Sequence, residues 1–145
     1  MRGNAESKVI CVVDDNVDAA DSLSTLLEVE GYTVHAAHNG IDGLATIFRT
    51  RPFLAILDIG MPGLTGYDVA SQVRATFGDS VRLIALSGWG TDEDVKRAML
   101  AGFDTHLTKP ADAGELLGLV QAYAETGTSR DAALLEPHCT AQQQP

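Results

Sequence analysis

Five polar residues follow short apolar stretches of the 145-residue chain, and their side chains could act together. They comprise three acids, a hydroxyl and an amine: Asp14, Asp15, Asp58, Ser87 and Lys109. If the apolar stretches are parallel strands, these residues meet at one edge, because ligands of open α/β sheets bind outside the carboxyl ends of the strands. A lone aspartate or serine at a strand end is more often a turn or cap residue. The joint occurrence of all five favours a shared site.

Three carboxylates brought together repel one another unless a cation lies between them. Carboxylate oxygens that leave room for retained water suit Mg²⁺ or Mn²⁺. A carboxylate at such a metal, with an ammonium and a hydroxyl opposite, is equipped to attack phosphorus. The metal and the ammonium then neutralise the charge on the equatorial oxygens of the transferring group. The set therefore predicts phosphoryl transfer to an aspartate.

Five apolar runs with β-rich composition are predicted to position these residues. The runs are Val9 to Val13, Thr33 to Ala37, Phe53 to Leu57, Leu83 to Leu86 and Thr105 to Thr108. Because the runs are continuously apolar rather than alternating, both faces of the sheet should be covered. Stretches with helical spacing separate the runs, so we expect repeated βα units and a parallel sheet between two layers of helices.

Capping residues mark where the helices should begin and end. Asn16, Thr91 and Asp112 are good N-caps for the first, fourth and last helices. The first helix should end before Gly31 and the second should span Ile41 to Arg49. The third should follow the loop GMPGLTG, with apolar residues on one face: Val69, Val73 and Phe77.

Composition limits the classes of protein to which the chain can belong. The net charge of -10 repels nucleic acid and anionic lipid, so we expect binding to neither. The chain has no apolar run long enough to span a membrane, and Cys11 and Cys139 show neither disulfide nor zinc spacing. We expect one cytoplasmic domain over residues 8–125, followed by a flexible tail over residues 126–145.

Four motifs make the chain resemble the receiver domain of a two-component response regulator. They are VVDD at 12–15, LDIGMPGLTG at 57–66, ALSGW at 85–89 and LTKP at 107–110. The similarity runs from about Lys8 to Tyr123. It implies an α/β, flavodoxin-like (βα)5 three-layer sandwich whose parallel five-stranded sheet has the order 2-1-3-4-5.

The resemblance implies a role for each acidic residue. Asp58 would be the phosphoacceptor and would also contact Mg²⁺. Asp15 would be a direct metal ligand, Asp14 would act largely through metal-bound water, and the backbone carbonyl of Gly60 would supply a further ligand.

The resemblance assigns the remaining site residues as well. Ser87 would hydrogen-bond the acquired phosphoryl group, and Lys109 would pair first with Asp58 and then with the phosphate. Pro110 should follow a cis peptide bond. Three residues of the 57–66 motif would shape the loop beside Asp58 and the turn into the next helix: Met61, Pro62 and Gly66.

Three positions differ from the commonest pattern of the family. Where receivers usually have a Tyr or Phe that rotates inward, this chain has His106, which either acts as a switch with a pH dependence of its own or is a partly exposed strand residue. Trp89 and Gly60 stand where side-chain size controls the access of water to the phosphoryl group. The large Trp89 would shield the phosphate, and Gly60 would leave room.

The expected partner is a histidine kinase or a histidine phosphotransfer protein that docks near the first helix. The signal should leave through protein contacts, either with a downstream target or with a second copy, on the face formed by the fourth helix, the last strand and the last helix. We expect a stand-alone receiver or one from a hybrid histidine kinase, with no enzymatic activity beyond its own aspartyl phosphorylation and dephosphorylation.

Two other classes of protein fit the residues less well. An adaptor that binds regardless of phosphorylation would have no use for the complete set of acids, hydroxyl and lysine. A phosphatase with an aspartyl-phosphate intermediate needs two aspartates spaced two residues apart after the first strand, and Asp14-Asp15-Asn16 does not supply that spacing.

Overall fold

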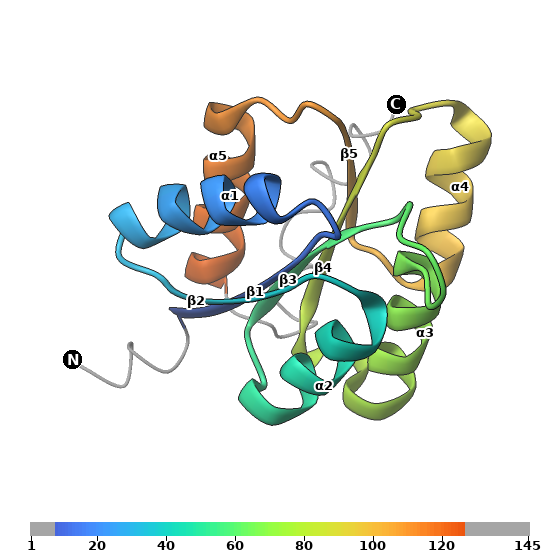
Figure 1. Cartoon of the computed structure of the whole chain (residues 1–145), viewed down its shortest axis with the longest axis horizontal. Coiled ribbons are helices and arrows are strands. Elements are labelled where there is room, and N and C mark those ends of the chain that lie inside the picture. Colours follow the sequence, from blue (N-terminus) through green and yellow to red (C-terminus); the bar gives the residue numbers. More distant parts are fainter. Residues whose placement is uncertain (1–7, 127–145) are drawn as a thin grey trace.

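The computed structural model describes residues 8–126, which form one sheet covered by helices on both faces (Figure 1). All strand pairs are parallel, and the strand order is β2-β1-β3-β4-β5. The strands are β1 (Val9–Val13), β2 (Thr33–Ala37), β3 (Leu54–Asp58), β4 (Arg82–Ser87) and β5 (Thr105–Thr108). This order confirms the flavodoxin-like prediction.

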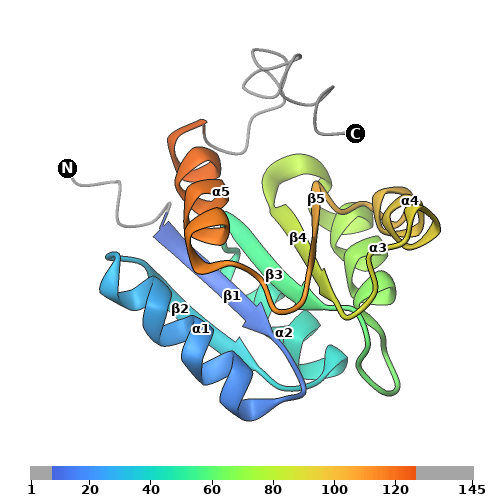
Figure 2. The same cartoon turned by 90° about the horizontal axis from the view of Figure 1, so that it is seen from above.

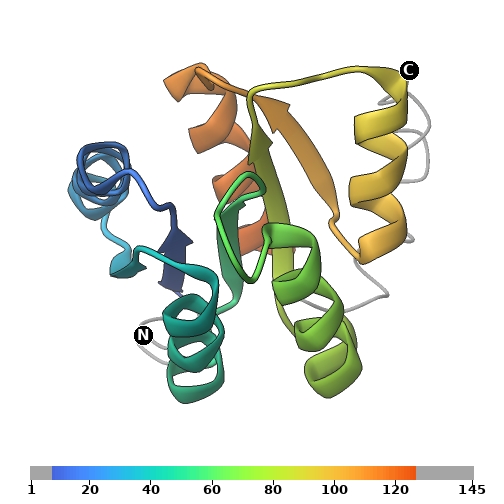
Figure 3. The same cartoon turned by 45° about the vertical axis from the view of Figure 1, so that its right-hand side comes forward.

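Five α-helices form the outer layers. They are α1 (Val17–Val29), α2 (Gly40–Thr50), α3 (Gly66–Phe77), α4 (Asp92–Ala101) and α5 (Ala113–Thr126), and a short 3-10 helix, η2 (Gly78–Ser80), follows α3. α1 and α5 lie on one face of the sheet, whereas α2, α3 and α4 lie on the other (Figures 1 and 3). Among the described residues, no helix combines the length and apolar character that a membrane span requires.

Alternate side chains of the strands fill two separate cores, one on each face of the sheet. In β1, Ile10 and Val12 pack with residues of α1 and α5, whereas Cys11 and Val13 pack with residues of α2, α3 and α4. All five residues of β3 are buried. This double burial explains why the strands are continuously apolar.

The three predicted N-caps are confirmed. Asn16 Oδ1 accepts the N–H of Ala19 at 3.0 Å, and Thr91 Oγ1 accepts a backbone N–H of α4 at 3.1 Å. Asp112 Oδ2 accepts the N–H of Glu115 at 2.9 Å. Each bond satisfies a donor that the first turn of a helix leaves unpaired, and together the caps define how the loops at this edge enter the helices.

The strands differ from the predicted ones mainly at their ends. β3 and β4 include Asp58 and Ser87 as their last residues, whereas the sequence placed both just after the strands. β4 also begins at Arg82, a buried residue whose guanidinium lies 3.4 Å from the Asp104 carboxylate and over the ring of Tyr123. The predicted tail over residues 126–145 and Cys139 fall outside the described residues, apart from Thr126 at the end of α5.

α2 packs very closely against the end of β1. A Cβ atom on Gly43 would lie 2.6 Å from Cγ1 of Val13, the residue that precedes Asp14. Val13 is β-branched and 1% exposed, so it has little freedom to move away. Because Gly43 has no side chain, α2 can pack closely on Val13, and this packing helps to hold the start of the acidic loop in place.

Gly43→Ala should destabilise the fold by about 1 to 3 kcal/mol through overpacking, despite the better helix propensity of alanine. The matched control is Gly118→Ala in α5, where no atom lies within 4 Å of the added Cβ. That control should gain about 0.5 to 1 kcal/mol. Urea unfolding followed by circular dichroism measures both changes. Equal effects of the two substitutions would contradict the close packing of α2 on β1.

Candidate functional site

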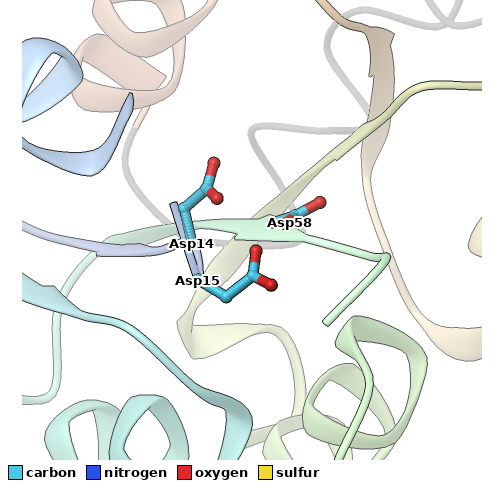
Figure 4. Close-up of side chains that lie close together, drawn as sticks. All are labelled: Asp14, Asp15 and Asp58. Atoms are coloured by element: carbon cyan, nitrogen blue, oxygen red, sulfur yellow. The ribbon is translucent and has the colours of Figure 1, made fainter. Parts of the chain in front are cut away.

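Three carboxylates gather at the carboxyl edge of the sheet, as the sequence predicted. Asp14 and Asp15 follow β1, and Asp58 ends the neighbouring strand β3. Each offers one oxygen, and these three oxygens lie within 4.8 Å of one another. Figure 4 shows the three side chains beside one another at the strand ends. Asp14 and Asp58 are only 4% and 6% exposed, whereas Asp15 is exposed, so the cluster is open on one side.

Lys109 links two of these carboxylates from the loop that follows β5. Its Nζ lies 3.1 Å from Asp14 Oδ2 and 3.4 Å from Asp58 Oδ1. Burial alone would lower the pKa of Lys109, but the Asp14 and Asp58 carboxylates outweigh it and hold that pKa above its ordinary value. The lysine is therefore an ammonium ion at neutral pH and offsets part of the negative charge. The peptide bond between Lys109 and Pro110 is cis, as the sequence predicted.

Asp58 lies in an environment that disfavours its charge. Burial raises the pKa of its carboxyl group, and the nearby Asp14 carboxylate raises it further. Lys109 and the N–H of Gly60, which donates to Asp58 Oδ1 at 3.2 Å, counter this shift only in part. An additional cation beside Asp58 would remove the repulsion that remains.

The loop after Asp58 places glycine where a side chain would collide with the site. A Cβ on Gly66, the first residue of α3, would lie 2.7 Å from the backbone oxygen of Asp58. Gly60 is exposed, and a Cβ there would have no atom within 4 Å, so the space beside it is open. Met61 is buried in the core, whereas Pro62 is exposed.

Ser87 ends β4 and is 3% exposed. Its hydroxyl donates to the backbone oxygen of Trp89 and accepts the backbone N–H of Trp89 at 3.3 Å. It also lies 2.9 Å from Nε2 of His106. Burial lowers the pKa of His106, and Asp94 on α4 opposes this shift only in part, so the imidazole is neutral at neutral pH.

The direct contact between Ser87 and His106 was not predicted from the sequence. The signal lies in the strand register, because His106 pairs with Ala85, two residues before Ser87 on the neighbouring strand. Trp89 is 67% exposed, and its backbone oxygen and N–H both hydrogen-bond the Ser87 hydroxyl.

The acidic cluster fits a hard divalent cation. Its donors are all carboxylate oxygens, and the exposed side at Asp15 leaves room for metal-bound water. The Lys109 ammonium pairs with only two of the three carboxylates, so negative charge remains in excess. This chemistry suits Mg²⁺ or Mn²⁺ and does not suit a metal that prefers sulfur or imidazole ligands.

Comparison with known families identifies the class of protein. The model of the response regulator receiver domain family matches residues 10–121. An uncharacterised 14.6 kDa protein of Leptolyngbya boryana is 39% identical over 115 residues, which cover 79% of this chain and 88% of that protein. Response regulator MprA of Mycobacterium tuberculosis is 36% identical over 124 residues. Those residues cover 86% of this chain but only 54% of MprA, so the chain spans about half the length of that relative.

Solved structures agree with this assignment. A CheY-like response regulator receiver domain from Methanospirillum hungatei has a TM-score of 0.76 at 29% identity, covering 81% of this chain and 94% of that one. A chain of the CheX-CheY-BeF3-Mg complex from Borrelia burgdorferi has a TM-score of 0.73 at 25% identity, covering 79% of this chain and 87% of that one. The chain belongs to the response regulator receiver domain family, whose general function is to accept a phosphoryl group and whose members bind Mg²⁺ at an acidic pocket.

Asp58→Asn should stabilise the metal-free protein at neutral pH. Because the pKa of Asp58 is raised by folding, its ionisation favours the unfolded chain, and asparagine removes that cost. We expect a gain of up to about 1 kcal/mol in the free energy of unfolding, limited by solvent at the open side of the cluster. The gain should disappear as the pH falls below the ordinary value of 3.8, where Asp58 becomes protonated in both the folded and the unfolded states.

Urea unfolding in metal-free buffer at neutral and acidic pH measures this gain. Glu28→Gln, on the exposed face of α1, is the control for removing one negative charge elsewhere. Destabilisation by Asp58→Asn at neutral pH would mean that pairing with Lys109 outweighs the repulsion.

Proposed function

We propose that this chain accepts a phosphoryl group on Asp58 in a Mg²⁺-dependent reaction and thereby switches its protein contacts in a two-component phosphorelay. One observation carries the proposal. Asp58 shares its edge of the sheet with two further carboxylates, while the Lys109 ammonium lies 3.4 Å from Oδ1 of the same aspartate. A carboxylate between a metal-binding cluster and an ammonium group has the surroundings that phosphoryl transfer needs.

In the proposed reaction, an Asp58 carboxylate oxygen attacks the phosphorus of a phosphohistidine. The new P–O bond forms as the P–N bond breaks, and the donor imidazole leaves with the bonding electron pair and then takes up a proton. The environment that raises the pKa of Asp58 makes the negative charge of its carboxylate unfavourable. When the acyl phosphate forms, negative charge moves from the carboxylate to phosphoryl oxygens that are paired with cations, and this favours the reaction.

The metal would be held by Asp14, Asp15 and Asp58, together with the backbone carbonyl of Gly60. When bound, Mg²⁺ would neutralise negative charge on the transferring group. The chain's own residues supply the rest. Lys109 would move from the carboxylates to the phosphoryl oxygens, and Ser87 would donate a hydrogen bond to one of them.

The phosphodonor would dock between α1 and α5. Figure 2 shows the two helices on the same face of the sheet. Residues of both helices line a cavity of about 580 Å³. Its walls are mostly apolar and include Leu23 and Leu26 of α1 and Leu116 of α5, while Asp14 and Lys109 line it at the site. An apolar groove that reaches the acidic cluster suits a helix of a histidine kinase or phosphotransfer protein that presents its phosphohistidine to Asp58.

The output would be a change in the face formed by α4, β5 and α5. Ser87 and His106 connect Asp58's neighbouring strand to β5 on this face. A downstream protein or a second copy of the chain would bind there, and the chain would function as a stand-alone receiver or within a hybrid histidine kinase. Residues 8–125 form the proposed receiver unit, with Trp89 and Gly60 controlling the access of water to the phosphoryl group.

Phosphorylation by acetyl phosphate tests the proposed function. Intact-mass spectrometry should show the gain of one phosphoryl group in the wild type with Mg²⁺, and no gain with a chelator or in Asp58→Asn. The Asp58→Asn variant should fold, because it relieves repulsion. A gain of equal size in Asp58→Asn, or none in a folded wild type that binds Mg²⁺, would contradict the proposal.

The docking groove is tested separately with Ser22→Arg. Ser22 lines the groove and is exposed, so a large cationic side chain there should slow transfer from a phosphorylated histidine phosphotransfer domain by about tenfold or more. Transfer from acetyl phosphate should be unchanged. The control is Thr25→Arg, an exposed position of α1 that does not line the groove. Equal rates for both variants with the protein donor would exclude this groove.

A further inference from the structure

The hydroxyl of Ser87 has no hydrogen-bonding capacity left. A serine hydroxyl has one proton to donate and two lone pairs that accept. Because a carbonyl oxygen only accepts, the Ser87 proton must go to the backbone oxygen of Trp89. The two lone pairs can then accept the backbone N–H of Trp89 at 3.3 Å and an N–H of His106 Nε2, which lies 2.9 Å away. We call this set of three bonds the closed arrangement.

The closed arrangement directs the hydroxyl away from Asp58. β4 lies between β3 and β5 in the sheet. Asp58, on β3, pairs with Leu86, and His106, on β5, pairs with Ala85, so the two lie on opposite sides of the strand that carries Ser87. A hydroxyl that moves toward a group on Asp58 therefore moves away from His106.

The same proton cannot serve Trp89 and a phosphoryl group. Phosphoryl oxygens that are ionised at neutral pH accept hydrogen bonds and donate none. To donate to such an oxygen, Ser87 must first release the backbone oxygen of Trp89. The closed arrangement and phosphoryl binding are therefore mutually exclusive states of one side chain.

We propose that His106 is a positioning residue whose Nε2–H holds Ser87 in an autoinhibitory closed arrangement and so opposes occupation of the phosphoryl site. This inference rests on the proposed function of Asp58. The stability of the closed arrangement then depends on whether the side chain at position 106 can donate a hydrogen bond. A phenylalanine side chain at this position cannot.

The surroundings of His106 determine which ring nitrogen carries the proton. Burial lowers the pKa of the ring, whereas Asp94 on α4 and a hydrogen bond to the backbone of His106 itself both raise it. β4 presents Ser87, and Lys109 follows three residues further along the chain. The closed arrangement requires Nε2 to donate to Ser87 and therefore requires the neutral ring to be the Nε2–H tautomer. Nitrogen NMR of the wild type should show this tautomer at neutral pH. The Nδ1–H tautomer would overturn the proposal.

Two substitutions separate the hydrogen bond from the bulk of the ring. His106→Phe keeps a planar ring without a donor, and His106→Gln keeps an N–H donor near the position of Nε2. Beryllofluoride with Mg²⁺ serves as the phosphoryl mimic. Trp89, the single tryptophan of the chain, reports binding by fluorescence because its backbone contacts Ser87. The apparent Kd should fall by about two- to tenfold in His106→Phe and stay near the wild-type value in His106→Gln.

The outcomes distinguish this proposal from the proposed function. Wild-type protein should bind beryllofluoride only when Mg²⁺ is present, and Asp58→Asn should abolish that binding. If either result is not obtained, the function assigned to Asp58 is wrong. If the wild type binds normally but His106→Phe binds equally or more weakly, the closed arrangement is not autoinhibitory. Urea unfolding confirms that both variants are folded. The rescue by His106→Gln is the result that a merely structural role would not produce.

Discussion

The repulsion among three carboxylates at one edge of the sheet is the constraint on which the site depends. Asp14 and Asp58 are nearly fully buried, which makes their charges costly and raises the pKa of Asp58. The backbone holds them together regardless, because β1 and β3 are paired in register up to Val13 and Leu57, the residues just before them. Lys109 offsets only part of the charge. The fold thus maintains a local electrostatic cost that a bound divalent cation would relieve.

The opposite edge of the sheet is built for stability. Arg74 of α3 lies 2.7 Å from the Asp104 carboxylate, which also accepts the backbone N–H of Leu83 at 2.9 Å. The same guanidinium donates to the backbone oxygens of Gly102 and Val81. These bonds join α3, β4 and the start of β5 at the amino end of the strands. Side-chain bonds thus tie the elements together at the amino end, whereas the carboxyl end holds the repelling acids and the Ser87 contacts.

Much of this architecture could be predicted from the sequence. Continuous apolar runs predicted the strands, Asn16, Thr91 and Asp112 predicted three caps, and the strand-end rule brought the acids to one edge. The burial of Arg82 could not be predicted, because it depends on Asp104, twenty-two residues away in the chain. The hydrogen bond between Ser87 and His106 likewise requires the register of β4 and β5, which residue types alone do not specify.

Asp58 carries a charge that its surroundings disfavour until a cation arrives, and the function proposed for the site follows from this. The most direct test is to titrate the carboxyl carbon of Asp58 by NMR with and without Mg²⁺. In metal-free protein the midpoint should lie above the ordinary value of 3.8, and Mg²⁺ should lower it. A midpoint at or below 3.8 without metal, or one that Mg²⁺ does not move, would contradict this electrostatic explanation.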